Sequence, residues 1–533
     1  MSEKPLGAQI SHMLKGRGVE VIFGIPGVHN QEMYRGIEEA GLMHVLARHE
    51  QGAGFMADGY ARATGMPGVC YVITGPGLCN AMTPMGQAYS DSVPVLVLSS
   101  SLAETEARKG QLHQMRDQEA AAATVCDWSA TARTADAAYH LIDRALTEFE
   151  VSRPRPKHIT VPIPLLEANA PAAPSAGELA DLPLAVEQDV IFVVEALSAA
   201  RRPLLIVGGG CTEAEFGARQ LAERFGCAVL CTYAGRGVIA EDHPYHFGSS
   251  LARPSSVEEI KKADLVLAVG TELSEVDLWR DALGHDAPLI RVDIDPVSLT
   301  SERMTQKMVL SDAGYFFDAV SMQSERSEIE VSPKDWTVDE VQAARQRWRS
   351  EISMERPGII EVADALKAIL PEDTMIFSDM TQFAYGAKEV YPMDRSGHWH
   401  HPYGFGTLGY ALPAAIGGKI GVGDQPVVAI AGDYGFQYTL QELMVAVELE
   451  LCLPILIWDN GKLGEIEDSM VGAQIAPNAV VQKNPDFMKL AEAYGAAAVA
   501  PQTLEALQTA LSDALSEPRP TIIRLTPEIV TNS

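Results

Sequence analysis

Basic residues are scarce in this 533-residue sequence, which has 41 Lys and Arg against 71 Asp and Glu and a formal net charge of −30. A surface for nucleic acid or anionic membrane needs a basic patch, so this balance argues against both partners. No apolar run of about 18 uncharged residues occurs, and the N-terminal segment has no signal-peptide core. We therefore expect a cytoplasmic protein with no nucleic-acid and no membrane partner.

Cysteine is also sparse. The seven cysteines form no C-x-x-C pair and have no histidine at zinc-site spacing. Most lie in apolar, strand-like runs, which indicates buried thiols in a reducing compartment. A G-x-G-x-x-G dinucleotide fingerprint is missing as well, because "IVGGGC" (206–211) does not have that spacing. A nicotinamide oxidoreductase built on this segment stays an alternative that the missing fingerprint weakens.

Strand-like apolar runs alternate with helix-length segments along the chain, which predicts an α/β fold with doubly wound parallel sheets. Segments rich in small, proline or charged residues divide the sequence into three blocks, at 1–168, 188–322 and 355–533. The clearest strand candidates are "VEVIFG", "GVCYVIT" and "VPVLVLS" in the first block, "PLLIV", "CAVLCT" and "ADLVLAVG" in the second, and "TMIFSD", "PVVAIAGD" and "LPILIWDN" in the third.

Two consecutive strands of the third block end in polar residues, Asp433 and Asn460. A right-handed crossover places both at the same edge of the sheet, where ligands bind. Mg²⁺ would take the oxygens of these two side chains and complete its shell with phosphate and water, and the backbone of "GDYGF" could hold a phosphate. A metal-bridged diphosphate is one interpretation and a plain strand-to-helix turn is the other. Thr439 and Glu442 have the spacing of a capping box for the next helix.

Gly432-Asp433 followed by Asn460 resembles the metal-binding motif of thiamine diphosphate-dependent enzymes. Tyr434 and Asp459 stand where that motif has a glycine and a first asparagine. The segment "GFGTLGYALPAAIGG" (404–418) resembles the aminopyrimidine-binding segment of the acetolactate synthase-like members of this family. The resemblance covers essentially the whole chain. It implies a pyrimidine-binding, a middle and a diphosphate- and Mg-binding domain in the three blocks, with thiamine diphosphate and Mg²⁺ as cofactors.

The resemblance also implies roles for individual residues. The metal ligands would be Asp433, Asn460 and the backbone carbonyl of Lys462. The cofactor contacts would come from Gly406, Leu408, Thr381, Gln382, Phe383, Gly432, Tyr434, Gly435, Gly27 and Asn80. Glu50, in "RHEQGAGFMADGYARATG" (48–65), would be catalytic and would exchange a proton with the aminopyrimidine N1′. The alternative for Glu50 is a helix-start carboxylate that the helix dipole favours.

Two loops of the first block, "FGIPGVHN" (23–30) and "QLHQMRDQ" (111–118), resemble the substrate-side loops of the family. They contribute Val28 as a substrate contact and His29, His113 and Gln118 as candidate catalytic residues. Histidine relays protons near neutral pH, but either histidine could equally be a satisfied structural residue. In the family these loops face the third block of a neighbouring chain, which implies a homodimer or homotetramer. The FAD-binding signatures of acetolactate synthases are absent from the middle block, so we expect no FAD.

Glu465 and Ile466 follow Asn460 at positions that roof the substrate pocket in the family. Acetolactate synthases have an apolar residue, typically Met, where this chain has Glu465. A carboxylate there suits a cationic substrate, because a guanidinium pairs with it through two hydrogen bonds. Alternatively, Glu465 turns outward with Glu467 and Asp468 as a solvated helix start. With the two substrate-side loops, this arrangement looks most like decarboxylases of 5-guanidino-2-oxopentanoate.

We therefore predict a thiamine diphosphate- and Mg-dependent non-oxidative decarboxylase that converts 5-guanidino-2-oxopentanoate to 4-guanidinobutanal and CO₂. The alternative is an acetolactate synthase-like carboligase that joins two 2-oxo acids. A cofactor-binding scaffold without catalysis is a third hypothesis, and the presence of Glu50 argues against it.

Overall fold

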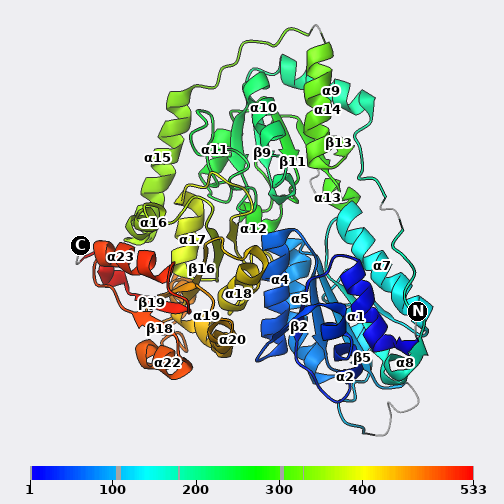
Figure 1. The fold of residues 1–533 in the computed structure, drawn as a ribbon. Coiled ribbons are helices and arrows are strands. Elements are labelled where there is room, and N and C mark those ends of the chain that lie inside the picture. The colour runs from blue at the N-terminus through cyan, green and yellow to red at the C-terminus, as the bar shows by residue number, and fades with distance from the viewer. Residues whose placement is uncertain (1–2, 104–109, 178–179, 301–304, 328, 532–533) are drawn as a thin grey trace. The chain divides into compact units, whose positions relative to one another are not determined.

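Three large sheets follow one another along the chain in the computed structural model, which describes residues 3–103, 110–177, 180–300, 305–327 and 329–531 (Figure 1). They contain six, five and six strands, and helices join the successive strands. The predicted α/β class with doubly wound parallel sheets is confirmed. None of the described helices is both long and apolar enough to cross a membrane.

Strand order is similar in the three sheets. The first sheet has the order β3-β2-β4-β5-β7-β6, the second β10-β9-β11-β12-β13 and the third β15-β14-β16-β17-β19-β18. The strands of the first sheet are β2 (Val21–Gly24), β3 (Met43–Leu46), β4 (Gly68–Val72), β5 (Val95–Ser101), β6 (Trp128–Thr131) and β7 (Lys157–Pro162). Those of the second are β9 (Pro203–Val207), β10 (Ala228–Cys231), β11 (Leu265–Val269), β12 (Leu289–Asp293) and β13 (Thr305–Leu310). Those of the third are β14 (Met375–Ser378), β15 (Trp399–His400), β16 (Val427–Gly432), β17 (Pro454–Trp458), β18 (Ala497–Val499) and β19 (Thr521–Leu525).

The longer helices lie between these strands. In the first block they are α1 (Leu6–Gly16), α4 (Glu50–Thr64), α5 (Pro76–Asp91) and α7 (Ala135–Val151). The middle stretch has α9 (Glu187–Ala199), α10 (Glu215–Phe225), α14 (Ala313–Arg326), α15 (Val338–Glu355) and α16 (Ile359–Lys367). The last stretch has α17 (Gln382–Val390), α18 (Ala411–Val422), α19 (Asp433–Tyr438), α20 (Leu443–Glu448), α21 (Gly464–Gly472), α22 (Phe487–Tyr494) and α23 (Leu504–Ala514).

Side chains along the central strands alternate between two buried cores, one on each face of the sheet. In β2, Phe23 packs into one core and Ile22 into the other. In β9, Leu205 packs into the core on one face of the second sheet and Leu204 into the core on the other face. Strands buried on both faces read as continuous apolar runs, which explains why the sequence marks them so clearly.

The edge strands β6 and β13 were not predicted from the sequence. Every residue of β6 is half-buried, and most residues of β13 are half-buried or exposed. An edge strand needs fewer apolar side chains than a central strand, so its sequence gives a weaker signal.

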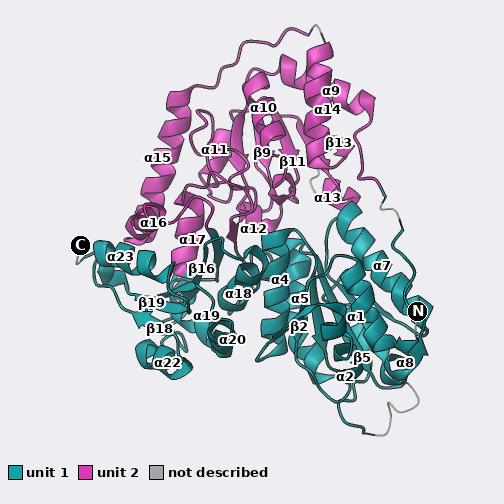
Figure 2. Ribbon diagram, in the orientation of Figure 1, with its two compact units in different colours: residues 1–180, 375–381, 401–533 teal, residues 181–374, 382–400 magenta. Residues whose placement is uncertain are grey.

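Two compact units divide the chain (Figure 2). One consists of residues 1–180, 375–381 and 401–533 and contains the first and third sheets. The other consists of residues 181–374 and 382–400 and contains the second sheet.

Within the first unit, α4 packs directly on α18, and glycines make this close approach possible. A Cβ atom at Gly59 would collide with the carbonyl oxygen of Ala414, and one at Gly417 would collide with the carbonyl of Met56. The small residues of "GAGFMADGY" and "AAIGGKIG" therefore serve helix packing between the two sheets.

Candidate active site

Asp433 lies at the carboxyl end of β16, beside the end of β17, since Gly432 pairs with Trp458 in a parallel register. Its side chain is buried, and its carboxylate accepts hydrogen bonds from the backbone N–H groups of Tyr434 and Gly461, both at 2.9 Å. The side-chain amide of Asn484 donates to the same carboxylate at 2.6 Å. Burial raises the pKa of Asp433, and the hydrogen bond from Asn484 opposes that rise.

The loop after β17 presents neutral oxygens at the same edge. The Asn460 side-chain oxygen accepts the N–H of Lys462 at 3.2 Å. Lys462 also lies opposite Val481 in an antiparallel bridge, whose hydrogen bonds join Leu463 to Val480 and Gln482 to Gly461. The Lys462 carbonyl takes no part in that pairing.

Those oxygens suit a hard divalent cation. A carboxylate from Asp433, an amide oxygen from Asn460 and a backbone carbonyl from Lys462 are the ligand types that Mg²⁺ takes, with phosphate and water completing the shell. In the part of the chain that the structure describes, no group of three or more His, Cys, Asp and Glu side chains could hold a metal ion. An ion at this edge would therefore depend on the neutral oxygens and on a bound phosphate.

Asp379, which was not predicted as a site residue, joins three segments of the third block. Its carboxylate accepts the N–H groups of Met380 and Gly409, each at 2.8 Å. A Cβ atom at Gly435 would lie 2.6 Å from the same carboxylate, so only glycine fits there. Burial raises the pKa of Asp379 to about 7. An aspartate at the end of the strand-like run "TMIFSD" was a signal that could have identified it.

Residues 381–383 divide between the two units. The buried Thr381 lies against Gly432, since a Cβ atom there would be 3.2 Å from the Thr381 hydroxyl. Gln382 and Phe383 begin α17 of the other unit, where Phe383 is buried. Thr381 therefore lies next to the Asp433 turn.

The segment 404–410 is fastened to the C-terminal half of α5. Gly404 donates its N–H to Asp91 at 2.8 Å, and the Thr407 hydroxyl donates to Gln87 at 2.9 Å. Between them, Gly406 has a φ of +64°, a conformation that favours glycine. The side chain of Leu408 is half-buried.

Glu50 is the first residue of α4 and is 9% exposed. Its carboxylate accepts a hydrogen bond of 2.9 Å from the side-chain amide of Asn80, near the start of α5. A Cβ atom at Gly77 would lie 3.2 Å from the other carboxylate oxygen. Of the predicted cofactor contacts, Asn80 is thus the one that the structure places beside Glu50.

Glu50 and the 404–410 segment are held at different parts of α5. Glu50 bonds to Asn80, whereas the segment bonds to Gln87 and Asp91. With a helix rise of about 1.5 Å per residue, these attachment points lie about 10–16 Å apart along the helix axis. Glu50 and the 404–410 segment therefore have separate attachment points on this helix.

His29 and His113 form a pair whose ring centroids lie 4.9 Å apart. Burial lowers the pKa of His29, and repulsion from a protonated His113 lowers it further. Among the described residues, neither ring has a hydrogen-bond partner for its Nδ1 atom. On the same loop as His29, Val28 is 63% exposed, and Gly27 donates its N–H to Asn30 at 2.7 Å.

Gln118 supports the turn at Gly75, which packs against the backbone of His113. Its side-chain oxygen accepts the N–H of Gly75 at 3.1 Å, and its amide nitrogen donates to the carbonyl of Ser100 at 2.8 Å. A Cβ atom at Gly75 would collide with the carbonyl oxygen of His113. Both ends of the Gln118 amide are therefore bonded within the protein.

The helix α21 carries the predicted substrate residues on its first turn. Glu465 is half-buried and Ile466 is 50% exposed. Glu467 forms an ion pair with Lys462, so it is not simply part of a solvated helix start as predicted. Asp468 is exposed, as expected for a solvated acid.

The predicted capping box at Thr439 and Glu442 does not form. Thr439 instead donates its hydroxyl to the carbonyl of Gly409 at 2.8 Å. The Glu442 carboxylate is buried against the start of α4 and accepts the N–H of Arg48 at 3.0 Å. The prediction was wrong because contacts with distant segments replace the local hydrogen bonds of a capping box.

Comparison with known proteins gives matches along most of the chain. The models for the thiamine pyrophosphate enzymes match as the N-terminal TPP binding domain at 5–121, the central domain at 190–320 and the C-terminal TPP binding domain at 379–525. A probable 2-ketoarginine decarboxylase of Pseudomonas aeruginosa is 41% identical over 525 residues, covering 97% of this chain and 93% of that protein. The large subunit of acetolactate synthase isozyme 3 from Escherichia coli is 29% identical, covering 94% of this chain and 91% of that protein.

Proposed function

Because the chain belongs to the thiamine pyrophosphate enzymes, we propose that it decarboxylates 5-guanidino-2-oxopentanoate, which is 2-ketoarginine, to 4-guanidinobutanal and CO₂. The observation that carries this proposal is the 41% identity, over nearly the whole of both chains, with a protein named as a probable 2-ketoarginine decarboxylase. The general reaction is a thiamine diphosphate-dependent decarboxylation of a 2-oxo acid.

Thiamine diphosphate, when bound, supplies the carbon that accepts the electron pair released as CO₂ leaves. Mg²⁺ would be held by the Asp433 carboxylate, the Asn460 amide oxygen and the Lys462 carbonyl, which are the oxygen ligands that this ion prefers. Glu50 would exchange a proton with the aminopyrimidine ring, with Asn80 fixing the orientation of its carboxylate.

Glu465 would select the substrate through its charge. A carboxylate on the first turn of α21, five residues after Asn460, would meet the far end of an extended substrate. A guanidinium offers paired N–H donors that match a carboxylate, whereas an uncharged acyl chain would leave Glu465 poorly solvated. This charge also makes an acetolactate synthase-like carboligase the weaker candidate.

His29 and His113 would transfer the proton that replaces CO₂ in the product. The lowered pKa of His29 keeps its ring neutral near pH 7, so it can accept a proton from a neighbour and return it. Gln118 would act on this pair indirectly by holding the Gly75 turn against His113.

A second copy of the chain would complete each active site. This assembly is supported by the separate attachment of Glu50 and the 404–410 segment along α5. A homodimer or a homotetramer would bring Glu50 of one chain to the Gly406 segment of another. We expect this assembly in the cytoplasm, because its seven cysteines are free and free thiols persist in a reducing compartment. We also expect that it binds no FAD.

A panel of 2-oxo acids assayed with thiamine diphosphate and Mg²⁺ tests the proposed substrate. We expect the highest kcat/KM for 5-guanidino-2-oxopentanoate, with lower values for 2-oxohexanoate, 3-methyl-2-oxobutanoate and pyruvate. A higher kcat/KM for an uncharged acid than for the guanidino acid would reject the proposed substrate.

A further inference from the structure

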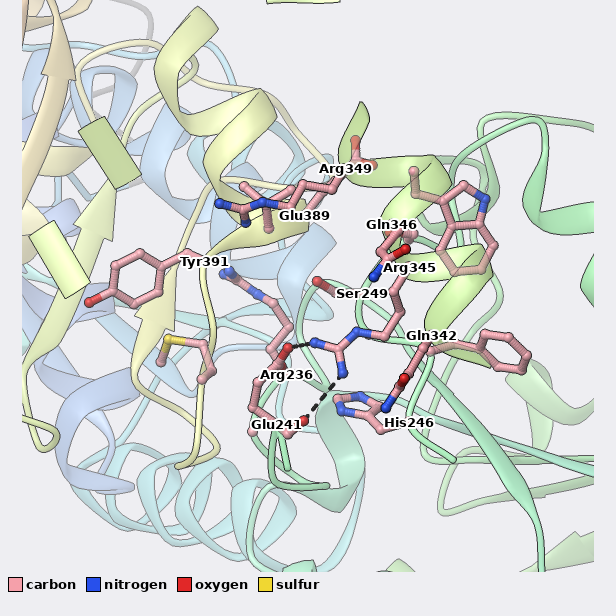
Figure 3. Close-up of a pocket in the computed structure, with 17 residues that line it drawn as sticks. Arg236, Glu241, His246, Ser249, Gln342, Arg345, Gln346, Arg349, Glu389 and Tyr391 are labelled. Atoms are coloured by element: carbon pink, nitrogen blue, oxygen red, sulfur yellow. Dashed lines mark hydrogen bonds and ion pairs between the residues drawn. The ribbon is translucent and has the colours of Figure 1, made fainter. Parts of the chain in front are cut away.

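A cavity of about 280 Å³ lies within the unit that contains the second sheet, and none of its lining residues was predicted as a site residue. Its walls are the segment 246–250, one face of α15 and the end of α17 with the residues that follow it (Figure 3). His246 pairs with Val229 of β10, so the first wall runs along the outer edge of that strand.

This position differs from the place where α/β sheets usually bind nucleotides. In the order β10-β9-β11-β12-β13, the strands are all parallel, and the strand order reverses at β9, because β10 lies on one side of β9 and β11 on the other; ligands bind at such a switch point. Here Gly208 and Gly210, which follow β9, pack against Gly270, which follows β11. The cavity lies instead at the edge strand β10.

Arg236 is the cation of this cavity that lacks an anion. It is 6% exposed, and its Nε donates to the carbonyl of Tyr233 at 3.1 Å. Its guanidinium carbon lies 4.6 Å from the centroid of the Trp399 ring, which covers one face of the group. Neither terminal nitrogen, Nη1 or Nη2, has a hydrogen-bond partner among the residues that the structure describes.

The carboxylates that line the cavity are already paired with other arginines. Glu241 forms an ion pair with Arg345, which Figure 3 shows as dashed lines that do not extend to Arg236. Glu389 pairs with Arg253 at 3.0 Å. Arg349, at the opposite wall, pairs with Asp364. The positive charge of Arg236 therefore has no carboxylate of this set to balance it.

We propose that this cavity binds a small organic oxyanion, a carboxylate or a phosphate group, through the two terminal nitrogens of Arg236. Burying an unpaired guanidinium costs free energy, and an oxyanion that accepts two parallel hydrogen bonds offsets that cost best. Ser249, Gln342 and Gln346 give the ligand polar contacts, and Tyr391 and Met393 give it apolar ones. The volume is slightly below the usual range for ligand pockets of roughly 300–1,000 Å³, so the ligand is small.

Calorimetric titration of the full-length enzyme tests this site. The enzyme is first saturated with thiamine diphosphate and Mg²⁺, so that phosphate cannot occupy the diphosphate site. Inorganic phosphate and succinate are then titrated separately, and the probe that binds identifies the oxyanion. Quenching of tryptophan fluorescence is expected with the same Kd, because Trp399 stacks on Arg236.

Arg236→Gln should raise the Kd of the binding probe at least about tenfold, because both charge-assisted hydrogen bonds are lost. Arg236→Lys keeps the positive charge but lacks the paired N–H donors of the guanidinium, so it should also weaken binding. This variant tests the site even if the glutamine variant does not fold. The matched control, Arg349→Gln, removes a cavity arginine that is paired with Asp364 and should change the Kd less than about threefold. The proposal is overturned if neither probe binds, or if the Arg236 and Arg349 variants lose affinity equally.

Discussion

Glu465 and Glu467 lie on the first turn of α21, but their surroundings differ. Glu467 is paired with Lys462, whereas Glu465 lies half-buried after the proposed metal loop. Charge alone did not distinguish them in the sequence, where the ion pair of Glu467 was missed. The proposed preference for a cationic substrate rests on one of these two carboxylates, that of Glu465.

Glu465→Gln tests whether the Glu465 carboxylate recognises the positive charge of the substrate. We expect it to raise KM for 5-guanidino-2-oxopentanoate about 10- to 100-fold, since a hydrogen bond between charged groups contributes about 1.5–3 kcal/mol. KM for 2-oxohexanoate, which has no positive charge, should change little. Asp468→Asn, which removes an exposed acid from the same helix, should leave both values unchanged. Equal increases for both substrates in the Glu465 variant would contradict the proposed role.

Residues marked by a local pattern were predictable, and residues defined by distant partners were not. Asp433 and Asn460 each follow a strand-like run, and the structure places both at one sheet edge. Asn484 gave no such signal, because its partner Asp433 is 51 residues away in the sequence. Asp379 follows a strand-like run, but its bonds to Gly409 could not be read from that run.

Two helix starts have the residue spacing of a capping box, but only one of these two forms the hydrogen bonds of the box. Thr337 and Glu340 form the reciprocal hydrogen bonds at the start of α15. Thr439 and Glu442 have the same spacing, yet their side chains bond to Gly409 and Arg48 instead. The central strands were predicted because burial on both faces leaves an apolar run, whereas a cap in a buried loop depends on tertiary contacts that spacing does not reveal.

Glu442→Gln tests the buried contact between Glu442 and α4. Burial raises the pKa of Glu442 from its ordinary 4.5 to about 7, so the folded state holds this proton more tightly than the unfolded state. The associated stability is fully present below pH 4.5 and is lost as pH rises through 7. The variant should unfold like wild type at low pH and should be about 1–3 kcal/mol more stable at pH 8.

Urea unfolding between pH 5 and 8 measures this difference. Glu448→Gln is the matched control, because Glu448 pairs with Arg48 on the surface and its side chain is 54% exposed. The control should follow the wild-type pH dependence. The account of Glu442 fails if its variant also loses stability in parallel with wild type across this range.

The proposed active site lies between two chains of an oligomer. Within one chain, Glu50 bonds to Asn80 of α5, whereas the 404–410 segment bonds to Gln87 and Asp91 of the same helix. A shared active site is implied by the family resemblance and not by composition or periodicity. The glycine contacts between α4 and α18 hold the helix that begins at Glu50 directly against the helix that follows the 404–410 segment.

Co-expression of two inactive variants tests the shared active site. Glu50→Gln and Asp433→Asn should each lose nearly all activity as homo-oligomers. In random dimers half of the molecules are mixed, and each mixed dimer has one intact site, so about a quarter of wild-type activity should return. Activity no higher than that of the separate variants would contradict an active site formed between two chains.

Product analysis by NMR of the wild-type enzyme with thiamine diphosphate, Mg²⁺, 5-guanidino-2-oxopentanoate and an equal concentration of pyruvate distinguishes decarboxylation from carboligation. Our prediction is one 4-guanidinobutanal and one CO₂ for each guanidino acid consumed, with pyruvate largely unchanged. Accumulation of 2-acetolactate with the guanidino acid left intact would contradict it and would identify a carboligase.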